Sequence, residues 1–380
     1  MSLFVEFHLI QNFAPSNLNR DDMGMPKDAI FGGYRRARVS SQCFKRAIRQ
    51  ATNVQGLIDP AFQGVRTQKL FQLLKEQLTE RGRSEADSRI EAVLNAAGLK
   101  LKEDFKTEYL LFLGNTEISS LAEVIDKHWN ELASVAPKGE KKSKKEAKAS
   151  APPVVVRKVK ALLDGGKAVD IALFGRMLAD LPEVNQDAAC QVAHAISTHY
   201  VQSESDYFTA MDDKAGANES GAAMIGQVEF NSATFYRYAV IDASKLLANL
   251  KQDKDLALAA IEAFTQAIAR AIPTGKQNSF AAHNPPSFVG IVVRSGEPLS
   301  LVNAFEKPIT PQQDKTLTSL SVKAMSTYEV KISDVYGKRT DAWSYLDLTA
   351  SWPAGKGEAQ DNLDALSDWV KNAVAQRLEA

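Results

Sequence analysis

Hydrophobic and polar residues alternate along several short segments of this chain, which is the pattern of a half-buried strand. The segment Leu3–Ile10, rich in Phe and Val, is the first of these segments. The other expected strands are 107–113, 169–177, 195–202, 227–241, 288–294 and 343–349, with 279–282 as a further short candidate. The segment 11–34 lacks this pattern and is rich in Asn, Pro, Asp and Gly. It is expected to form a long irregular loop, of the kind that is usually functional or disordered.

Apolar residues three or four positions apart mark the expected helices. The most informative helix follows Ser40 or Ser41 as its N-cap and places Phe44, Ala47 and Ile48 on one apolar stripe. The other expected helices lie within 65–97 and at 118–133, 243–251, 254–271, 312–335 and 361–378. Because helices and strands mix without regular βα alternation, the sequence predicts an α+β fold rather than a doubly wound sheet.

Two segments are too polar to bury a core of their own. The segment 137–153 holds six Lys against two Glu between Lys138 and Lys148, and we expect a flexible surface loop there. Its charge also suits non-specific attraction of nucleic acid, although a solvated linker is the simpler interpretation. The segment 203–226 is acidic and rich in Gly and Ala, which predicts a protruding arm or long hairpin that becomes ordered against something else.

Composition narrows the class of protein. The chain has 380 residues, 44% hydrophobic and 24% charged, which is enough for a large core in roughly two domains. Its two cysteines, Cys43 and Cys190, form neither a disulfide framework nor a metal-binding pattern, which favours a reducing compartment. The N-terminus shows no signal peptide, and no apolar stretch approaches the roughly 18 residues that span a bilayer. We therefore expect a cytoplasmic protein that makes no membrane contact.

Charge is unevenly distributed along a chain whose formal net charge is zero. Between Arg20 and Arg49 the sequence contains eight basic residues and three Asp (Asp21, Asp22 and Asp28), which gives this segment a net charge of +5. The eight are Arg20, Lys27, Arg35, Arg36, Arg38, Lys45, Arg46 and Arg49. A phosphate backbone is the obvious partner for such a concentration of positive charge.

The helix at the end of this segment adds detail to that prediction. Its periodicity places Lys45 and Arg49 together on one face, with Arg46 beside them. Gln42 and the serine hydroxyls lie in the first turn, where backbone N–H groups and the helix dipole favour an anion. A solvated basic helix remains the alternative, but the convergence of loop, helix start and basic face favours a polyanion site.

Motifs for catalysis and for metal binding are mostly missing. The five histidines show no metal-ligand spacing, and the segment TGKQN at 274–278 lacks the frame of a P-loop. The pair Asp21-Asp22 could bind a cation or act as a general base, although adjacent acids before a basic segment are more often loop hydrogen-bonders. We therefore expect no enzyme, no catalytic residue, no metal site and no cofactor.

Four blocks of the sequence resemble a known family. They are LNRDDMGMPKDAIFGGYRRARVSSQ with KRAIR (18–49), VDIALFGRM (169–177), AHAISTHYVQSESDYFTAMDD with EFNSATFYRYA (193–239), and NAFEK (303–307). Together they resemble the CasC-type backbone subunit of the type I-E CRISPR surveillance complex, Cascade. The likeness extends from residue 1 to about 310, and it is loose over 55–168 and over the C-terminal 70 residues.

The resemblance implies a fold more specific than α+β. It implies an RRM-like, ferredoxin-like palm, a helical fingers insertion and a protruding β-hairpin thumb. In this sequence the palm corresponds to 1–54, 169–201 and 228–380, the fingers to 55–168 and the thumb to 202–227.

The resemblance also implies a non-catalytic function. Several copies would stack into a filament along one CRISPR guide RNA, and each thumb would displace a nucleotide, so that the segments between pair with target DNA. The partners would be the guide RNA, target DNA through the guide, copies of the same chain, other Cascade subunits and a recruited helicase-nuclease. An acidic thumb that carries Asp212 and Asp213 could lie over a neighbour's basic palm.

Individual site residues follow from the same resemblance. Met177 would stack against a base, although it could equally be an ordinary core residue, and the same alternative holds for Phe208 at the thumb base. The residues implied to bind RNA are Arg20, Lys27, Arg38, Ser40, Gln42, Lys45, Arg46, Arg49, Arg176, Met177, Phe208 and Thr209. Two other functions remain open: a guide-bound metal-dependent ribonuclease that uses Asp22, and a generic single-strand RNA-binding protein.

Overall fold

The computed structural model describes residues 2–132, 151–178, 181–210, 214, 224–336 and 341–379. The Lys-rich tract 138–148 and the pair Asp212-Asp213 therefore lie outside the described residues. The chain divides into two compact units. Unit 1 comprises Met1–Gln55, Gln191–Ser244 and Ile261–Ala380, and unit 2 comprises Gly56–Cys190 and Lys245–Ala260.

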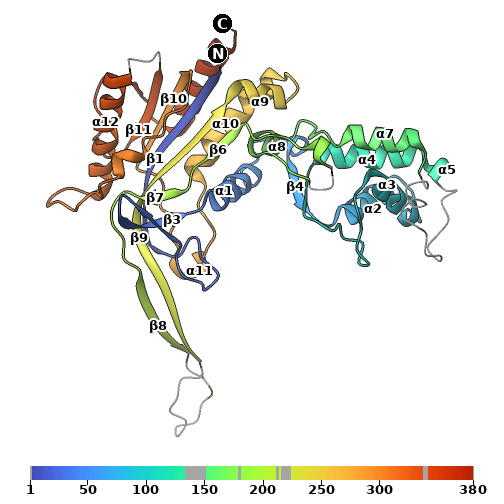
Figure 1. The fold of residues 1–380 in the computed structure, drawn as a ribbon, viewed down its shortest axis with the longest axis horizontal. Helices are drawn as coiled ribbons and strands as arrows, with labels where there is room; N and C mark the ends of the chain where they lie inside the picture. Colours follow the sequence, from blue (N-terminus) through green and yellow to red (C-terminus); the bar gives the residue numbers. More distant parts are fainter. Residues whose placement is uncertain are drawn as a thin grey trace. The chain divides into compact units, whose positions relative to one another are not determined.

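Unit 1 is built on a large mixed sheet (Figure 1). Its main path runs in the order β12-β11-β10-β1-β9-β7-β3-β2, and β6 and β8 also pair with β9. Neighbours on the path are antiparallel, except that β11 and β12 are parallel. The strands are β1 (Leu3–Ser16), β2 (Asp28–Phe31), β3 (Tyr34–Val39), β6 (Cys190–Val192), β7 (Ala195–Ser197), β8 (Glu204–Ala210), β9 (Met224–Asp242), β10 (Phe288–Ser295), β11 (Ala342–Asp347) and β12 (Glu358–Ala359). The sequence-based prediction of an α+β fold is confirmed.

Helices cover both faces of this sheet, because its central strand alternates two sets of buried side chains. On one face, Phe7 packs against Phe264 of α10 (Lys254–Arg270), with ring centroids 4.9 Å apart. On the other face, Ile10 packs in a cluster with Val322 and Met325 of α12. The remaining helical segments of this unit are α1 (Ser41–Val54), α11 (Gln277–Phe280), η3 (Val302–Phe305), α12 (Leu317–Tyr336) and α13 (Leu363–Glu379).

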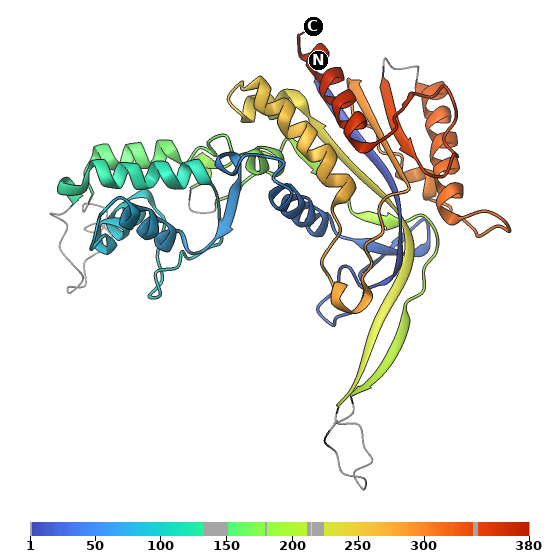
Figure 2. The ribbon, with the colours of Figure 1, turned by 180° about the vertical axis from the view of Figure 1, so that it is seen from behind.

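A long hairpin continues from the sheet of unit 1 (Figures 1 and 2). The strand β8 pairs with the N-terminal half of β9, from Glu204 opposite Phe230 to Ala210 opposite Met224. Every residue of β8 is exposed, so the hairpin is held by its ladder rather than by a core. The predicted arm is therefore a β-hairpin over its described residues.

Unit 2 is mainly helical and has its own core. Its helices pack around a cluster that includes Leu74, Ile90, Leu121 and Val155, beside a two-stranded β4-β5 sheet. Its elements are η1 (Pro60–Phe62), β4 (Gly64–Thr67), α2 (Leu70–Glu80), α3 (Asp87–Ala97), β5 (Leu111–Gly114), α4 (Asn115–Lys127), α5 (Trp129–Leu132), α7 (Pro153–Leu162), α8 (Val169–Phe174) and η2 (Pro182–Val184). Two helices belong to both units: α9 (Ala243–Asn249) begins in unit 1 and ends in unit 2, and α10 begins in unit 2 and ends in unit 1.

Three sequence-based predictions of elements are wrong. The expected strand 169–177 is the helix α8, because periodicity cannot separate a short buried apolar run in a strand from one in a helix. The candidate strand 279–282 overlaps the helical turn α11. The expected loop 11–34 is largely ordered: β1 continues to Ser16, and β2 pairs with β3 from Asp28 opposite Ala37 to Phe31 opposite Tyr34.

No helix among the described residues is long and apolar enough to cross a membrane.

The described part of unit 1 buries a polar cluster on the α12 face of its sheet. The Glu6 carboxylate lies 2.7 Å from Nε of Arg294 and accepts a hydrogen bond from the hydroxyl of Tyr238. Beside it, Nδ1 of His8 lies 2.9 Å from the hydroxyl of Tyr236. All of these groups are largely or fully buried, so the cluster depends on their mutual contacts.

This cluster makes folding stability depend on pH. Burial lowers the pKa of His8, and the Glu6 carboxylate offsets this only in part. Below about pH 6.5 the unfolded chain binds a proton at this side chain that the folded chain excludes, so stability is full above that pH and falls as pH decreases. Urea unfolding at pH 7.5 and 5.5 should show lower stability at pH 5.5 and a weaker pH dependence in His8→Gln. Equal pH dependence in both proteins would contradict this assignment.

Candidate nucleic-acid interface

The loop that precedes α1 is organised by one carboxylate. Oδ1 of Asp21 accepts hydrogen bonds from the backbone N–H groups of Met23 (3.0 Å) and Met25 (2.9 Å). The side chain of Asn17 donates to the carbonyl of Gly24 (3.0 Å), which holds the loop to the end of β1. The loop is therefore ordered by its own contacts, and the interpretation of Asp21 as a loop hydrogen-bonder is confirmed.

Helix α1 begins where the sequence indicated. Oγ of Ser40 accepts a hydrogen bond from the N–H of Cys43, and the predicted apolar stripe of Phe44, Ala47 and Ile48 is buried. The first turn is less open to an anion than expected, since Nδ1 of His194 accepts from the N–H of Ser41 (3.2 Å). Burial, with the charges of Arg38 and Lys27, lowers the pKa of His194, which keeps its imidazole neutral and able to accept.

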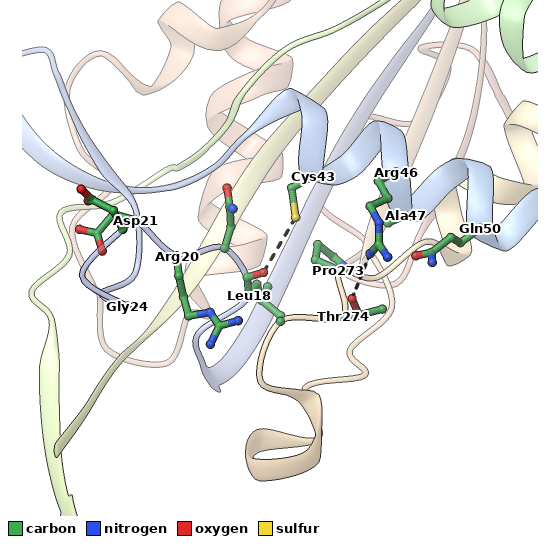
Figure 3. Close-up of a pocket in the computed structure, with 13 residues that line it drawn as sticks. Leu18, Arg20, Asp21, Gly24, Cys43, Arg46, Ala47, Gln50, Pro273 and Thr274 are labelled. Carbon is green, nitrogen blue, oxygen red and sulfur yellow. Dashed lines mark hydrogen bonds between the residues drawn. The ribbon is translucent and has the colours of Figure 1, made fainter. Parts of the chain in front are cut away.

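A groove of about 500 Å³ lies between this loop, α1 and the segment 273–275 (Figure 3). Arg46 and Gln50 face it from α1, Arg20 faces it from the loop, and Thr274 closes the far wall. Nη1 of Arg46 lies 3.4 Å from Oγ1 of Thr274. The complete lining is Leu18, Asn19, Arg20, Asp21, Asp22, Gly24, Cys43, Arg46, Ala47, Gln50, Pro273, Thr274 and Gly275. Guanidinium groups at two walls of one groove can hold phosphate oxygens by charge-assisted, bidentate hydrogen bonds.

Sequence reasoning missed the wall formed by residues 273–275. The segment TGKQN attracted notice only as an incomplete P-loop, and nothing in its composition indicates that it meets α1. A close backbone approach fixes it there: a Cβ on Gly275 would lie 2.7 Å from the carbonyl carbon of Leu18 and 2.9 Å from the carbonyl oxygen of Asn17. The available signal was the glycine itself, since a loop glycine often marks such an approach.

Gly275→Ala should therefore displace this wall from the loop. The clash is with backbone atoms, which cannot rotate away, so we expect reduced stability and weaker binding of single-stranded RNA. Asn278→Ala, at an exposed position of the same segment, is the matched control. Thermal unfolding together with RNA titration of both variants tests this, and a Gly275→Ala protein that matches the control in both would contradict it.

The predicted basic residues divide into several groups. Arg20 and Arg46 line the groove, whereas Lys45, Arg49 and the exposed Gln42 lie on α1 outside its lining. Lys27 and Arg38 border a smaller hollow beside β3. The sequence therefore placed most of these cations correctly on the loop and helix. It did not separate the groove from its surroundings.

Two other arginines of the basic segment have structural partners. Arg36 is fully buried, and its guanidinium donates to the carbonyls of Ser197 (2.9 Å), Phe305 (2.8 Å) and Glu306 (3.1 Å). Nε of Arg35 lies 3.1 Å from a carboxylate oxygen of Asp28. The positive charge available to a ligand is therefore smaller than the count of eight basic residues suggested.

Arg176, a predicted RNA-binding residue, does not fit that role. Its side chain is fully buried in unit 2, with Nη1 2.9 Å from Oε1 of Glu117. Nη2 donates to the carbonyls of Leu163 (2.9 Å) and Val184 (3.0 Å). The guanidinium is thus committed to internal partners and cannot reach a phosphate without breaking them. We remove it from the candidate set.

The neighbouring Met177 is 83% exposed, so it is not an ordinary core residue. It borders an apolar pocket of about 210 Å³ in unit 2, together with Tyr109, Leu110 and Leu178. An exposed thioether beside an apolar pocket can stack on a flat apolar partner such as a base.

Phe208 and Thr209 lie on the exposed strand β8. Phe208 is opposite Gly226 in the ladder and is 39% exposed, and its ring occupies the place that a side chain at Gly226 would take. The ring is therefore held against the hairpin with one part open to solvent, which suits stacking against an unpaired base.

No cluster of three or more His, Cys, Asp or Glu side chains that could hold a metal ion occurs among the described residues. Asp22 lines the groove, but the adjacent Asp21 is engaged by the loop backbone. The groove thus combines two arginines with polar groups and two aspartates, and its arginines are suited to holding a phosphodiester chain.

A family model described as CT1975-like protein matches residues 5–371, nearly the whole chain. The chain belongs to this CT1975-like family. None of the curated proteins compared with the chain matches it.

Solved structures agree with this assignment. The chain superimposes on one described as "CRISPR RNA-guided surveillance complex, pre-nicking" with a TM-score of 0.86 at 32% identity, and the match covers 97% of this chain and 99% of that one. A second, described as "CRISPR RNA-guided surveillance complex", gives 0.75 at 28% identity with the same coverage. The resemblance drawn from the sequence blocks is confirmed.

Proposed function

We propose that this chain is a non-catalytic backbone subunit of a CRISPR RNA-guided surveillance complex and that it binds the guide RNA. The observation that carries this proposal is the match of 97% of the chain, at 32% identity, to a chain of such a complex. The arginine-lined groove of unit 1 supplies the chemistry, since it presents cations to a phosphate backbone. Sequence reading is left to base pairing between guide and target DNA.

The order of elements supports a ferredoxin-like palm. The elements β1, α1, β7, β9, α10 and β10 follow a βαββαβ order, and the four strands lie side by side as β10-β1-β9-β7 with antiparallel neighbours. In this proposal the helical segment 55–168, inserted between α1 and β7, forms the fingers, and 202–227 forms the thumb. The compact unit 2 is larger than this fingers segment, because it also includes 169–190 and 245–260.

The proposed RNA-binding residues fall into two sets. The cations and polar groups of the loop and α1 would hold the sugar-phosphate backbone, with Arg20 and Arg46 as the central pair. Met177, Phe208 and Thr209 would contact bases, by stacking for the first two. The complete backbone-binding set is Arg20, Lys27, Arg38, Ser40, Gln42, Lys45, Arg46 and Arg49.

Partners follow from a backbone role. Copies of this chain would stack along one guide, other Cascade subunits would join the assembly, and the complex would recruit a helicase-nuclease to the paired target DNA. A generic single-strand RNA-binding protein would bind as independent monomers instead. Cooperativity along the RNA therefore separates the two functions.

The test is loading onto a CRISPR guide RNA in the presence of the companion Cascade proteins. We expect several copies per RNA, with cooperative and strongly salt-dependent assembly, and reduced loading by Lys45→Glu/Arg49→Glu. Binding by independent monomers would favour the generic RNA-binding function. Absence of loading by the unaltered chain would reject the proposal.

A further inference from the structure

The groove of unit 1 carries acids as well as arginines. Asp21 and Asp22 border the same space as Arg20 and Arg46. Asp21 has a structural role, because its carboxylate accepts two backbone hydrogen bonds within the loop. The exposed carboxylate of Asp22 has no hydrogen bond or ion pair with any residue that the structure describes.

A free carboxylate is unfavourable in a groove that binds phosphates, since the two like charges repel. A ligand that brings a hydrogen-bond donor to this carboxylate offsets the repulsion. RNA carries such a donor at every sugar, the ribose 2′-hydroxyl, and DNA does not. We propose that Asp22 accepts a hydrogen bond from a ribose 2′-hydroxyl of the bound strand, and that this contact gives the groove a preference for RNA over DNA.

This inference rests on the proposed function, because it requires a nucleic acid in the groove. Arg20 and Asp22 lie two residues apart on one loop, so a nucleotide whose phosphate contacts Arg20 brings its sugar to the same loop. The discrimination then has two parts. With RNA, the hydrogen bond offsets the repulsion, whereas with DNA the carboxylate stays unpaired beside phosphates.

The charge of Asp22 separates it from the neutral groups of the same groove. Thr274 and Gln50 also present oxygen atoms there. A neutral hydroxyl or amide imposes no electrostatic penalty on a DNA strand, so it cannot exclude DNA in the same way. Asp22 is therefore the specificity-determining residue in this proposal, and its role requires no metal and no cleavage.

The experiment compares binding of one unstructured RNA oligonucleotide and the DNA of identical sequence to the full chain. The variants are Asp22→Ala and Asp22→Asn, with Asp361→Asn as a charge-matched control at an exposed position outside the groove. We expect Asp22→Ala to reduce the ratio of RNA to DNA affinity about tenfold, mainly through tighter DNA binding. Asp22→Asn keeps an acceptor oxygen without the charge and should be intermediate, while the control should match the unaltered chain.

The outcomes separate this inference from the proposed function. RNA binding with an affinity ratio that is the same in all variants would overturn the role of Asp22 and leave RNA binding intact. An unaltered chain that binds RNA and DNA equally would also overturn it. An unaltered chain that binds neither strand would reject the proposed function itself.

Discussion

Replacing Arg20 and Arg46 together by glutamate is expected to weaken RNA binding about a hundredfold or more. Both guanidinium groups line the groove beside the basic loop, and a phosphate that loses both loses two charge-assisted hydrogen bonds. The new carboxylates also repel the strand. The measurement is RNA affinity as a function of salt concentration. The salt dependence should be shallower in the variant, because fewer cations are released on binding.

The control for this experiment must carry the same change of charge. Lys323→Glu/Lys331→Glu alters two exposed lysines of α12, which is not part of the groove lining. This variant should bind RNA nearly as well as the unaltered chain. Equal loss in both double variants would mean that net charge, rather than the groove, governs binding, and the site assignment would then be wrong.

Arg176→Met is expected to destabilise unit 2 by about 3–5 kcal/mol, the usual cost of leaving one member of a buried ion pair unpaired. The Glu117 carboxylate would stay buried, although it would still accept hydrogen bonds from the N–H groups of Gly114 (2.6 Å) and Gly165 (2.8 Å). Denaturant unfolding measures the effect. The double variant Arg176→Met/Glu117→Gln should recover part of the loss, because it removes the uncompensated charge and keeps an acceptor.

This prediction also decides between the two interpretations of Arg176. If the guanidinium is structural, stability falls and RNA affinity, measured under conditions where the variant is folded, is little changed. If it contacts RNA, as the resemblance alone implied, affinity falls while stability is preserved. The second result would contradict the buried pairing seen in the structure.

The sequence predicted best those elements whose structure depends on interactions between residues close together in the chain. The stripe of Phe44, Ala47 and Ile48 and the cap at Ser40 depend on neighbours within one helix, so the sequence identified α1 correctly. The segment VDIALF was assigned to a strand because a short apolar run carries no clear period. The acidic, Gly-rich arm was recognised because such a composition cannot form a core, and every residue of β8 is indeed exposed.

The candidate site was less predictable, because its partners come from distant segments. Arg36 and Arg38 look equivalent in the sequence. Arg36 is nevertheless buried, and its guanidinium donates hydrogen bonds to the carbonyls of residues 197, 305 and 306. The guanidinium of Arg176 is likewise bound by Glu117, 59 residues earlier in the chain, and is therefore not available to a ligand. The wall at 273–275 meets Leu18 across more than half of the sequence. Charge counting locates a basic region, but only tertiary contacts show which charges remain available.

The most direct measurement is a cross-linking map of the chain assembled on a guide RNA that carries photoreactive nucleotides. Mass spectrometry would then identify the peptides attached to RNA. We expect cross-links at the groove, in residues 18–24, 42–50 and 273–275, and at the exposed hairpin around Phe208. Cross-links confined to other surfaces, such as the Lys-rich tract 138–148, would contradict the groove as the site that holds the guide.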